Sequence, residues 1–258
     1  MVGVDREGIA AGLPSFVVAD ALVARSVHTM DDASARHIRV LRLEVGALVA
    51  LRDGQGAIAE AQIVRLSKAQ TQVEVRAVHH REPLHPIHLL VPVADRDRML
   101  LLAEKACELG CTSWRPVLWR RSRSVAPRGE GATFQAKVRS RMQQALAQSE
   151  GCWLPELYPE ANVERAILAS PSGHRFVLDP AGPPLVGSHG LLHGASDSAI
   201  VLAVGPEGGI EADELAAFEA AGFRRASIGT TILRFETAAI AALAMARTVA
   251  GHSDLRGS

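Results

Sequence analysis

The sequence predicts an α/β protein that carries a small β-barrel at its N-terminus and a mostly parallel sheet in the remainder. In residues 16–78, short apolar runs alternate with turn signals, and only one helical pattern interrupts them. From Ile87 onward, strand-like and helix-like segments alternate, which is typical of a parallel sheet with right-handed crossovers. Between these parts, residues 79–86 include two prolines, which disfavour continued strand pairing. We therefore expect a linker there, with domains at residues 1–82 and 83–258.

The first part contains the signals of short strands around one helix. Turn residues at 53–56 and 67–70 separate apolar runs and predict two hairpin connections. A helix is predicted over residues 32–43, with Asp31 or Asp32 as its N-cap. Short strands at regular spacing with a single small helix favour a compact barrel.

The second part predicts strands and helices in alternation. The expected strands are residues 87–93, 114–119, 176–178, 199–204 and 226–228. The expected helices are residues 97–109, 133–148, 163–169 and 212–221, and a last helix that ends at Ala250. Residues 238–245 of that helix are apolar on every face, which predicts burial on more than one side and a homodimer seam.

Composition excludes several classes of protein. Of 258 residues, 48% are hydrophobic and 22% are charged, as in ordinary globular proteins. No apolar run approaches the roughly 18 residues of a membrane span, and Asp5, Arg6 and Glu7 do not fit a signal peptide. Three scattered cysteines predict neither a disulfide framework nor a metal site. We therefore expect a cytoplasmic protein without metal.

Basic residues cluster in two regions although the net charge is zero. Between Trp114 and Arg141 there are eight basic residues against the single acid Glu130: Arg115, Arg120, Arg121, Arg123, Arg128, Lys137, Arg139 and Arg141. The second cluster consists of Arg36, His37, Arg39 and Arg42. Such runs indicate either a solvated face or a polyanionic partner such as RNA.

Three predicted strand ends carry turns that suit a ligand site. They are Asp179-Pro180-Ala181-Gly182, Gly205-Pro206-Glu207-Gly208-Gly209, and the stretch from Gly229 through Ile232-Leu233-Arg234-Phe235-Glu236-Thr237-Ala238. In open α/β sheets ligands bind at the carboxyl ends of strands, and glycines let the backbone approach them. The turns match neither a phosphate loop nor a dinucleotide fingerprint. Together they predict a site that holds a flat heterocycle by main-chain hydrogen bonds, although residues 179–182 taken alone would suit an ordinary strand-to-helix turn.

The second and third of these turns, Gly205–Gly209 and Ile232–Ala238, resemble the C-terminal signature of the RsmE family of SPOUT methyltransferases. The resemblance extends to residues 37–43, which are similar to the family's H(I/L)xRVLR string, and to residues 104–110, which are similar to its (E/Q)KxxELG helix. Gln148-Ser149 with Leu154-Pro155-Glu156 resembles its EQSxR…VPE segment. Here Ala147 replaces the acid of that segment, and Glu150 or Gly151 stands at the place of its arginine.

The resemblance implies a fold, a cofactor and a substrate. It implies a PUA-like barrel, a domain with a trefoil knot, a homodimer, and methylation of N3 of a uridine in 16S rRNA, free or in the assembled small subunit. It also implies S-adenosylmethionine bound by the three knot loops. The expected cofactor contacts are Leu178, Asp179, Pro180, Val204, Gly205, Pro206, Gly208, Gly209, Ile228, Gly229, Ile232, Leu233 and Thr237.

The chemistry of the implied reaction points to three charged residues. Uridine N3 attacks well only after losing its proton, so the site needs a base or a group that stabilises the anion. Arg234 can stabilise the anion, and Glu207 or Glu236 is the base or a structural group. For RNA we expect Arg36, His37, Arg39, Arg42, Arg120, Arg121 and Arg123, in one positive surface that leads to Arg234. Two alternatives remain: methylation of another RNA, at a tRNA base or ribose 2′-hydroxyl, and a vestigial enzyme that only binds RNA.

Overall fold

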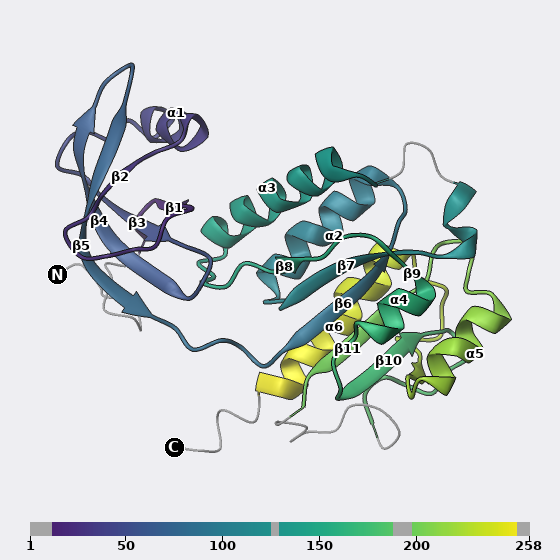
Figure 1. The fold of residues 1–258 in the computed structure, drawn as a ribbon. Helices are drawn as coiled ribbons and strands as arrows, with labels where there is room; N and C mark the ends of the chain where they lie inside the picture. The colour runs from purple at the N-terminus through teal and green to yellow at the C-terminus, as the bar shows by residue number, and fades with distance from the viewer. Residues whose placement is uncertain (1–11, 125–128, 188–197, 252–258) are drawn as a thin grey trace, which may run out of the picture. The chain divides into compact units, whose positions relative to one another are not determined.

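A computed structural model describes residues 12–124, 129–187 and 198–251, and for Arg123, Ser124 and Gly251 only the backbone (Figure 1). The N-terminal Asp5, Arg6 and Glu7 therefore lie outside the described residues. The chain forms two compact units. Unit 1 contains Met1–Pro83 and Leu146–Leu154, and unit 2 contains Leu84–Ala145 and Pro155–Ser258.

Unit 1 is a curled five-stranded sheet with one helix. Its elements are β1 (Ser15–Val17), β2 (Val27–Thr29), α1 (Asp32–Val40), β3 (Leu48–Arg52), β4 (Ala57–Leu66) and β5 (Thr71–His80). The strand order is β1-β3-β4-β5-β2, with β1 parallel to β3 and the remaining pairs antiparallel. Both predicted hairpin turns join strands, one between β3 and β4 and the other between β4 and β5.

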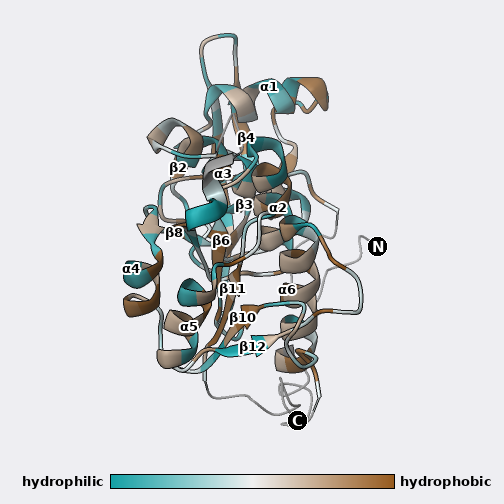
Figure 2. Cartoon of the chain, turned by 90° about the vertical axis from the view of Figure 1, so that its right-hand side faces the viewer, coloured by the Kyte–Doolittle hydropathy of each residue, from teal (hydrophilic) through white to brown (hydrophobic). Residues whose placement is uncertain are grey.

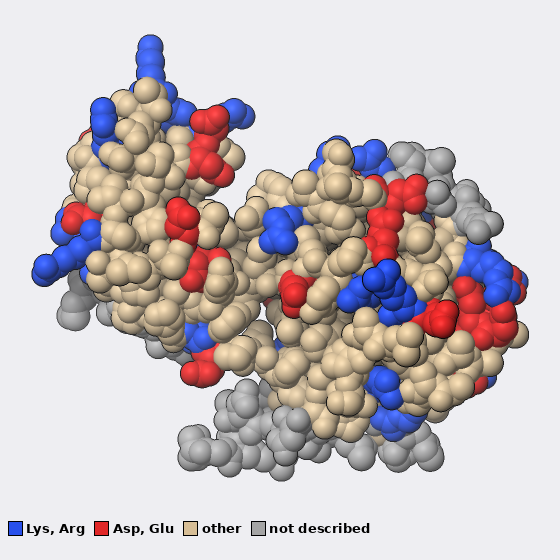
Figure 3. All heavy atoms as spheres, in the orientation of Figure 1, with Lys and Arg blue, Asp and Glu red and all other residues tan. Residues whose placement is uncertain are grey.

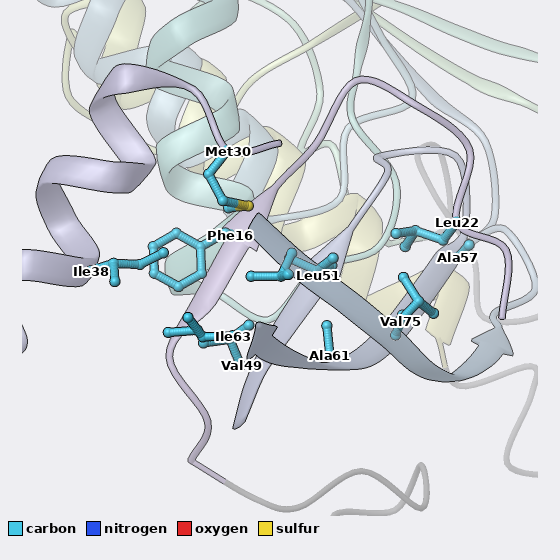
Figure 4. Packing of buried hydrophobic residues seen from close by; sticks show 12 residues of the cluster. Phe16, Leu22, Met30, Ile38, Val49, Leu51, Ala57, Ala61, Ile63 and Val75 are labelled. Carbon is cyan, nitrogen blue, oxygen red and sulfur yellow. The ribbon is translucent and has the colours of Figure 1, made fainter. Parts of the chain in front are cut away.

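Alternating side chains of this sheet make a core on its concave side. Leu51, Ile63 and Val75 pack there with Phe16 and with Ile38 of α1 (Figure 4). Asp31 is the N-cap of α1, and its carboxylate accepts a hydrogen bond of 2.7 Å from the Ser34 N–H. The predicted helix was too long, because Arg42 adopts a left-handed conformation with φ of 55° and the helix ends at Val40.

The predicted linker is also shorter than expected. His79 and His80 still pair with Ile58 and Ala57 as the last residues of β5. The strand continues this far because the first proline, Pro83, comes three residues after His80.

Residues 146–154 return to unit 1 from the second half of the chain. The Gly56 N–H donates to the Cys152 carbonyl, and the Leu154 N–H donates to the Gly54 carbonyl, both over 2.9 Å. The Trp153 ring packs so closely on Gly56 that a Cβ there would lie 2.4 Å from Cζ2 of the ring. This returning segment therefore completes the edge of the β3–β4 hairpin.

Arg52 at the end of β3 holds the returning segment by its side chain. It is 2% exposed, and its Nη1 donates to the carbonyls of Glu150 and Gly151 over 2.7 and 3.1 Å. Its Nε donates to Oγ of Ser15 over 2.9 Å. Among the residues that the structure describes, no carboxylate pairs with this guanidinium. Its hydrogen bonds to oxygen atoms of the chain therefore compensate its burial.

Unit 2 is a parallel α/β sheet. Its strands are β6 (Ile87–Pro92), β7 (Ser113–Leu118), β8 (Glu156–Leu157), β9 (Ala161–Asn162), β10 (His174–Leu178), β11 (Ile200–Val204) and β12 (Arg224–Ala226). Its helices are α2 (Arg96–Glu108), η1 (Arg120–Ser124), α3 (Ala132–Gln148, whose last three residues belong to unit 1), α4 (Val163–Leu168), α5 (Ala212–Ala220) and α6 (Phe235–Gly251). The strand order is β12-β10-β11-β6-β7-β8, β9 also pairs with β7, and every pairing is parallel.

Helices cover both faces of this sheet. In Figure 2, α4 and α5 lie on one side of it and α2 and α6 on the other. Every residue of the central strand β11 is buried, as expected for a parallel strand packed on both faces. The predicted strands and helices of unit 2 are present with small shifts at their ends. The short elements β8, β9 and η1 were not predicted.

The last helix, α6, is buried on one side only. Ala239, Ala242, Leu243 and Ala246 are buried, and α6 packs there on α2, β6 and β11. The residues between them, including Ala241 and Ala244, are partly exposed. Neither α6 nor any other helix within the described residues is long and apolar enough to cross a membrane.

Replacement of Arg52 tests the returning segment. Arg52→Met should lower the free energy of unfolding by about 2 kcal/mol, because it leaves two carbonyls at the segment without their donor. Chemical denaturation of the full chain measures this. The control Arg65→Met removes an exposed arginine of β4 and should change stability by less than about 0.5 kcal/mol. Equal effects of both variants would contradict the role of Arg52.

Candidate functional site

A pocket of about 310 Å³ lies at the carboxyl ends of β10, β11 and β12. β10 pairs with both other strands, so the loops that follow the three strands emerge side by side. The loops are residues 179–182, 205–211 and 227–234. The lining residues are Leu178, Asp179, Pro180, Val204, Gly205, Pro206, Glu207, Gly209, Ile210, Ala226, Ser227, Ile228, Gly229, Thr231, Ile232, Leu233, Phe235 and Ala238.

Most of the predicted cofactor contacts line this pocket. The exceptions are Gly208, which packs against Arg121, and Thr237, which is exposed in the first turn of α6. The sequence reading missed Ile210, Ala226, Ser227, Thr231, Phe235 and Ala238. Ile210, Ala226 and Ser227 lie within a few positions of the predicted motifs, whereas Thr231, Phe235 and Ala238 lie inside the third motif but were not predicted as contacts.

The loop after β10 is fixed by Asp179. Its Oδ1 accepts a hydrogen bond from the Ala181 N–H, and its Oδ2 accepts one from Nε of Arg225, both over 2.9 Å. Burial opposes the charged carboxylate, but these two donors outweigh burial and hold the pKa of Asp179 below its ordinary value of 3.8. Asp179 therefore supports the turn as a carboxylate.

The loop after β11 contains a tight turn with a charged side chain at its tip. The Gly209 N–H donates to the Pro206 carbonyl over 2.9 Å, and Gly209 has a φ of 80°, which favours glycine. Glu207 lies between them, lines the pocket and forms an ion pair with Arg98 of α2. Its carboxylate is therefore already engaged with a cation at the pocket.

The loop after β12 leads directly into α6. Its Ile232 is 89% exposed, and a side chain at Gly229 would meet no atom within 4 Å. Arg234 is exposed between the pocket residues Leu233 and Phe235, and its carbonyl accepts the Ala238 N–H over 2.9 Å at the start of α6. No described side chain pairs with its guanidinium, which leaves the group available to a substrate.

Glu236, the third predicted catalytic residue, is buried. It is 6% exposed in the first turn of α6, where the helix dipole favours a negative charge. Its Oε2 has no hydrogen-bond partner among the described residues, and Glu236 is not one of the described residues that line the pocket. Of the three predicted catalytic residues, only Glu207 is among the described residues that line the pocket; Arg234 and Glu236 are not.

The two basic clusters differ in how their charges are engaged. Arg36, His37, Arg39 and Arg42 are exposed on or just after α1, and no acidic side chain in the described ranges pairs with these arginines. In unit 2, Arg120 pairs with Asp213 and Arg121 pairs with Glu211, both from the region of α5. The guanidinium of Arg115 lies 4.4 Å from the centre of the Tyr158 ring.

On the face shown in Figure 3, many Lys and Arg side chains of unit 2 lie beside Asp and Glu. The side chain of Arg123 and the whole of Arg128 lie outside the described residues.

The described residues offer no group of three or more His, Cys, Asp or Glu side chains that could hold a metal ion. Cys107 and Cys111 are buried, and burial raises the pKa of each thiol to about 12. These thiols are therefore protonated and unreactive at neutral pH.

The pH dependence of stability tests the role of Asp179. Because its pKa is lower in the folded chain, Asp179 stabilises the fold above pH 3.8, and this stabilisation is lost as the pH falls through the lowered folded-state value. Asp179→Asn should therefore be less stable than the wild type at pH 7 and 5, with a smaller difference at pH 3. Chemical denaturation at the three values measures it, with Asp20→Asn, an exposed loop aspartate, as the control. A difference that stays constant down to pH 3 would contradict the assignment.

Comparisons with known proteins agree with this architecture. A family model described as "RNA methyltransferase domain" matches residues 80–247, and one described as "RNA methyltransferase PUA domain" matches residues 31–76. The ribosomal RNA small subunit methyltransferase E of Synechocystis sp. is 28% identical over 243 residues, which cover 89% of this chain and 75% of the relative. Its namesake from Mycobacterium tuberculosis is 26% identical and is matched over 85% of both chains.

Solved structures show the same fold. The ribosomal RNA small subunit methyltransferase E of Neisseria gonorrhoeae, bound to S-adenosyl methionine, matches with a TM-score of 0.82 and 28% identity over 92% of this chain and 98% of that chain. A methyltransferase from Legionella pneumophila matches in fold with a TM-score of 0.78 and 24% identity over 92% of this chain and 97% of that one. These relatives confirm the resemblance carried by the motifs. Since the family model covers more than half of the sequence, the chain belongs to the RNA methyltransferase family, with an RNA methyltransferase PUA domain ahead of the methyltransferase domain.

Proposed function

We propose that this enzyme transfers a methyl group from S-adenosylmethionine to N3 of one uridine in the 16S rRNA of the small ribosomal subunit. The observation that carries the proposal is the pocket formed by the loops after β10, β11 and β12. Support for the cofactor and for rRNA comes from the Neisseria relative, which has the same fold over nearly the whole chain and was solved with S-adenosyl methionine. The N3 position rests on the motif resemblance. Since this substrate is a ribosomal RNA, we propose that the protein acts in the cytoplasm.

The residues of the pocket fit this cofactor. A pocket of about 310 Å³ lies at the lower end of the range for small-molecule sites. Leu178, Ile210 and Leu233 supply apolar surface for a flat base, and Gly205 and Gly229 line the pocket without side chains, so the main chain there can come close to a ligand. When bound, the cofactor supplies a methyl group on a positively charged sulfur.

Arg234 is the residue that we assign to the substrate. Uridine N3 must lose its proton before it attacks, and the resulting charge spreads over O2 and O4 of the base. A guanidinium offers a planar set of donors for such an anion. Arg234 is exposed beside the pocket residues Leu233 and Phe235, and no described residue occupies its guanidinium. Arg234 would therefore stabilise the anion directly.

The two glutamates suit this reaction less well as bases. Glu207 lines the pocket but forms an ion pair with Arg98. Because the neighbouring cation favours the charged carboxylate, Glu207 is a poor acceptor for the proton of the substrate. Glu236 is buried in the first turn of α6. We therefore propose that Glu207 shapes the loop after β11 and that Glu236 supports α6.

Contacts to the RNA backbone come from α1 in this proposal. Arg36, Arg39 and Arg42 present three exposed positive charges without described acidic partners. Phosphate contacts of this kind position RNA without reading its sequence.

Methyl transfer in vitro tests the function. Purified protein with methyl-labelled S-adenosylmethionine should label 16S rRNA, as free RNA or in small subunits, and mass mapping should find the methyl group on N3 of a single uridine. Arg234→Ala should lower the rate about 100-fold or more while cofactor affinity changes less than about twofold, since it removes a donor that acts on the developing anion.

The matched control is Arg165→Ala, which removes an exposed arginine of α4 and should keep near-normal turnover. A methyl group on a ribose or on tRNA alone would overturn the proposed target. Near-normal turnover of Arg234→Ala would overturn the proposed chemistry.

We also propose that the protein is a homodimer whose interface includes the partly exposed side of α6. Ala241 and Ala244 are small, and small residues let two helices approach closely. Light scattering at micromolar concentration should give twice the mass of the chain, and Ala244→Glu should give a monomer because it places a charge in an apolar interface. A monomeric wild type would contradict this proposal.

A further inference from the structure

The loop after β11 is held by an arginine that the pocket does not include. Arg121 in η1 donates from Nη1 to the Gly208 carbonyl over 2.8 Å and from Nε to Oε1 of Glu211 over 2.7 Å. Glu211 is the N-cap of α5, so these two bonds join the tip of the loop to its end. One planar side chain thus fixes the loop at two points.

Arg121 also packs against the turn itself. A Cβ at Gly208 would lie 3.1 Å from Cβ of Arg121, and one at Gly209 would lie 3.7 Å from its Nη1. The same turn lines the pocket with Pro206, Glu207 and Gly209. A shift of Arg121 therefore changes the backbone that faces the pocket.

The start of η1 is held by contacts with α5. Trp119 is buried, and its ring stacks on Phe218 of α5 with 5.2 Å between ring centres. The Arg120 N–H donates to Oε1 of the buried Glu214 over 2.8 Å. The backbone that carries Arg121 is thus anchored on α5 from the residues just before it.

The neighbouring Arg120 resembles Arg121 except that its side chain does not contact the loop after β11. Both are arginines of η1, both are about half exposed, and both pair with an acid near the start of α5. The side chain of Arg120 bonds Asp213 and no residue of the loop, whereas Arg121 bonds Gly208. A comparison of variants at these two positions therefore distinguishes the effect of losing a positive charge from the effect of losing the contact with the loop.

We propose that Arg121 is a positioning residue for cofactor binding: it holds residues 206–211 in the shape that accepts S-adenosylmethionine, and it does not serve as a phosphate contact. This assignment replaces the prediction that Arg121 binds RNA. It rests on the proposed function, because it requires the cofactor to lie in the three-loop pocket.

Calorimetry without RNA tests the proposal by titrating S-adenosylmethionine and its demethylated product into wild type, Arg121→Met and Arg120→Met. Arg121→Met should bind about tenfold or more weakly, which is about 1.4 kcal/mol, because it loses both bonds of a charged donor. Arg120→Met should bind both compounds with a Kd within about twofold of the wild-type value. Arg121→Lys keeps a donor for the Gly208 carbonyl and should fall between them.

Kinetics supply a second readout that a loss of stability alone would not produce. In methyl transfer, Arg121→Met should raise KM for S-adenosylmethionine about tenfold and lower kcat at saturation less than about threefold, since it leaves the reacting groups in place.

Three results would overturn the proposal. If Arg121→Met binds the cofactor like the wild type and instead lowers the salt dependence of RNA binding, Arg121 is a phosphate contact. If Arg120→Met and Arg121→Met weaken cofactor binding equally, the effect comes from the lost positive charge and not from the contact between Arg121 and the loop. If the wild type binds neither compound, the proposed function itself fails, and this inference fails with it.

Discussion

Parallel pairing of three neighbouring strands is the constraint on which the rest of the site depends. Leu178 at the end of β10 is in register with Val204 of β11 and with Ala226 of β12, so three loops begin at one level of one sheet edge. The register is held by burial, because β11 is buried along its whole length between helices on both faces. A shift of one residue would exchange the side chains of different size that face the two helix layers and move one loop away from the pocket.

The loops after β10 and β11 are rich in glycine and proline and contain few side chains that could hold them by packing. Arginines from other elements supply what is missing. Arg225 holds Asp179, Arg98 pairs with Glu207, and Arg121 binds Gly208 and Glu211. Of these three arginines, only Arg121 belongs to the basic stretch between Trp114 and Arg141. These cations organise the protein, whereas Arg36, Arg39 and Arg42 on or just after α1 are exposed without a described acidic partner.

Features coded by neighbouring residues could be predicted from the sequence, whereas features made by distant residues could not. The turns at residues 53–56 and 205–209 were foreseen, since glycine and proline specify turns locally. The return of residues 146–154 was not foreseen, because its contacts join Arg52 to residues about 100 positions away and leave no local pattern. Arg121 looked like one member of a charge run, and its partner Glu211 lies 90 positions later. The burial of Glu236 was missed for a different reason: a carboxylate near a helix start fits a cap, a base or a support equally well.

The central claim is that S-adenosylmethionine lies against the main chain of the three loops. Hydrogen–deuterium exchange of the full chain with and without the cofactor tests it most directly, because it reports on backbone N–H groups segment by segment. The account predicts slower exchange in residues 178–182, 204–210 and 227–234 together, and little change in β3, β4 and β5 of unit 1. Protection confined to unit 1, or protection that spares all three loops, would contradict it.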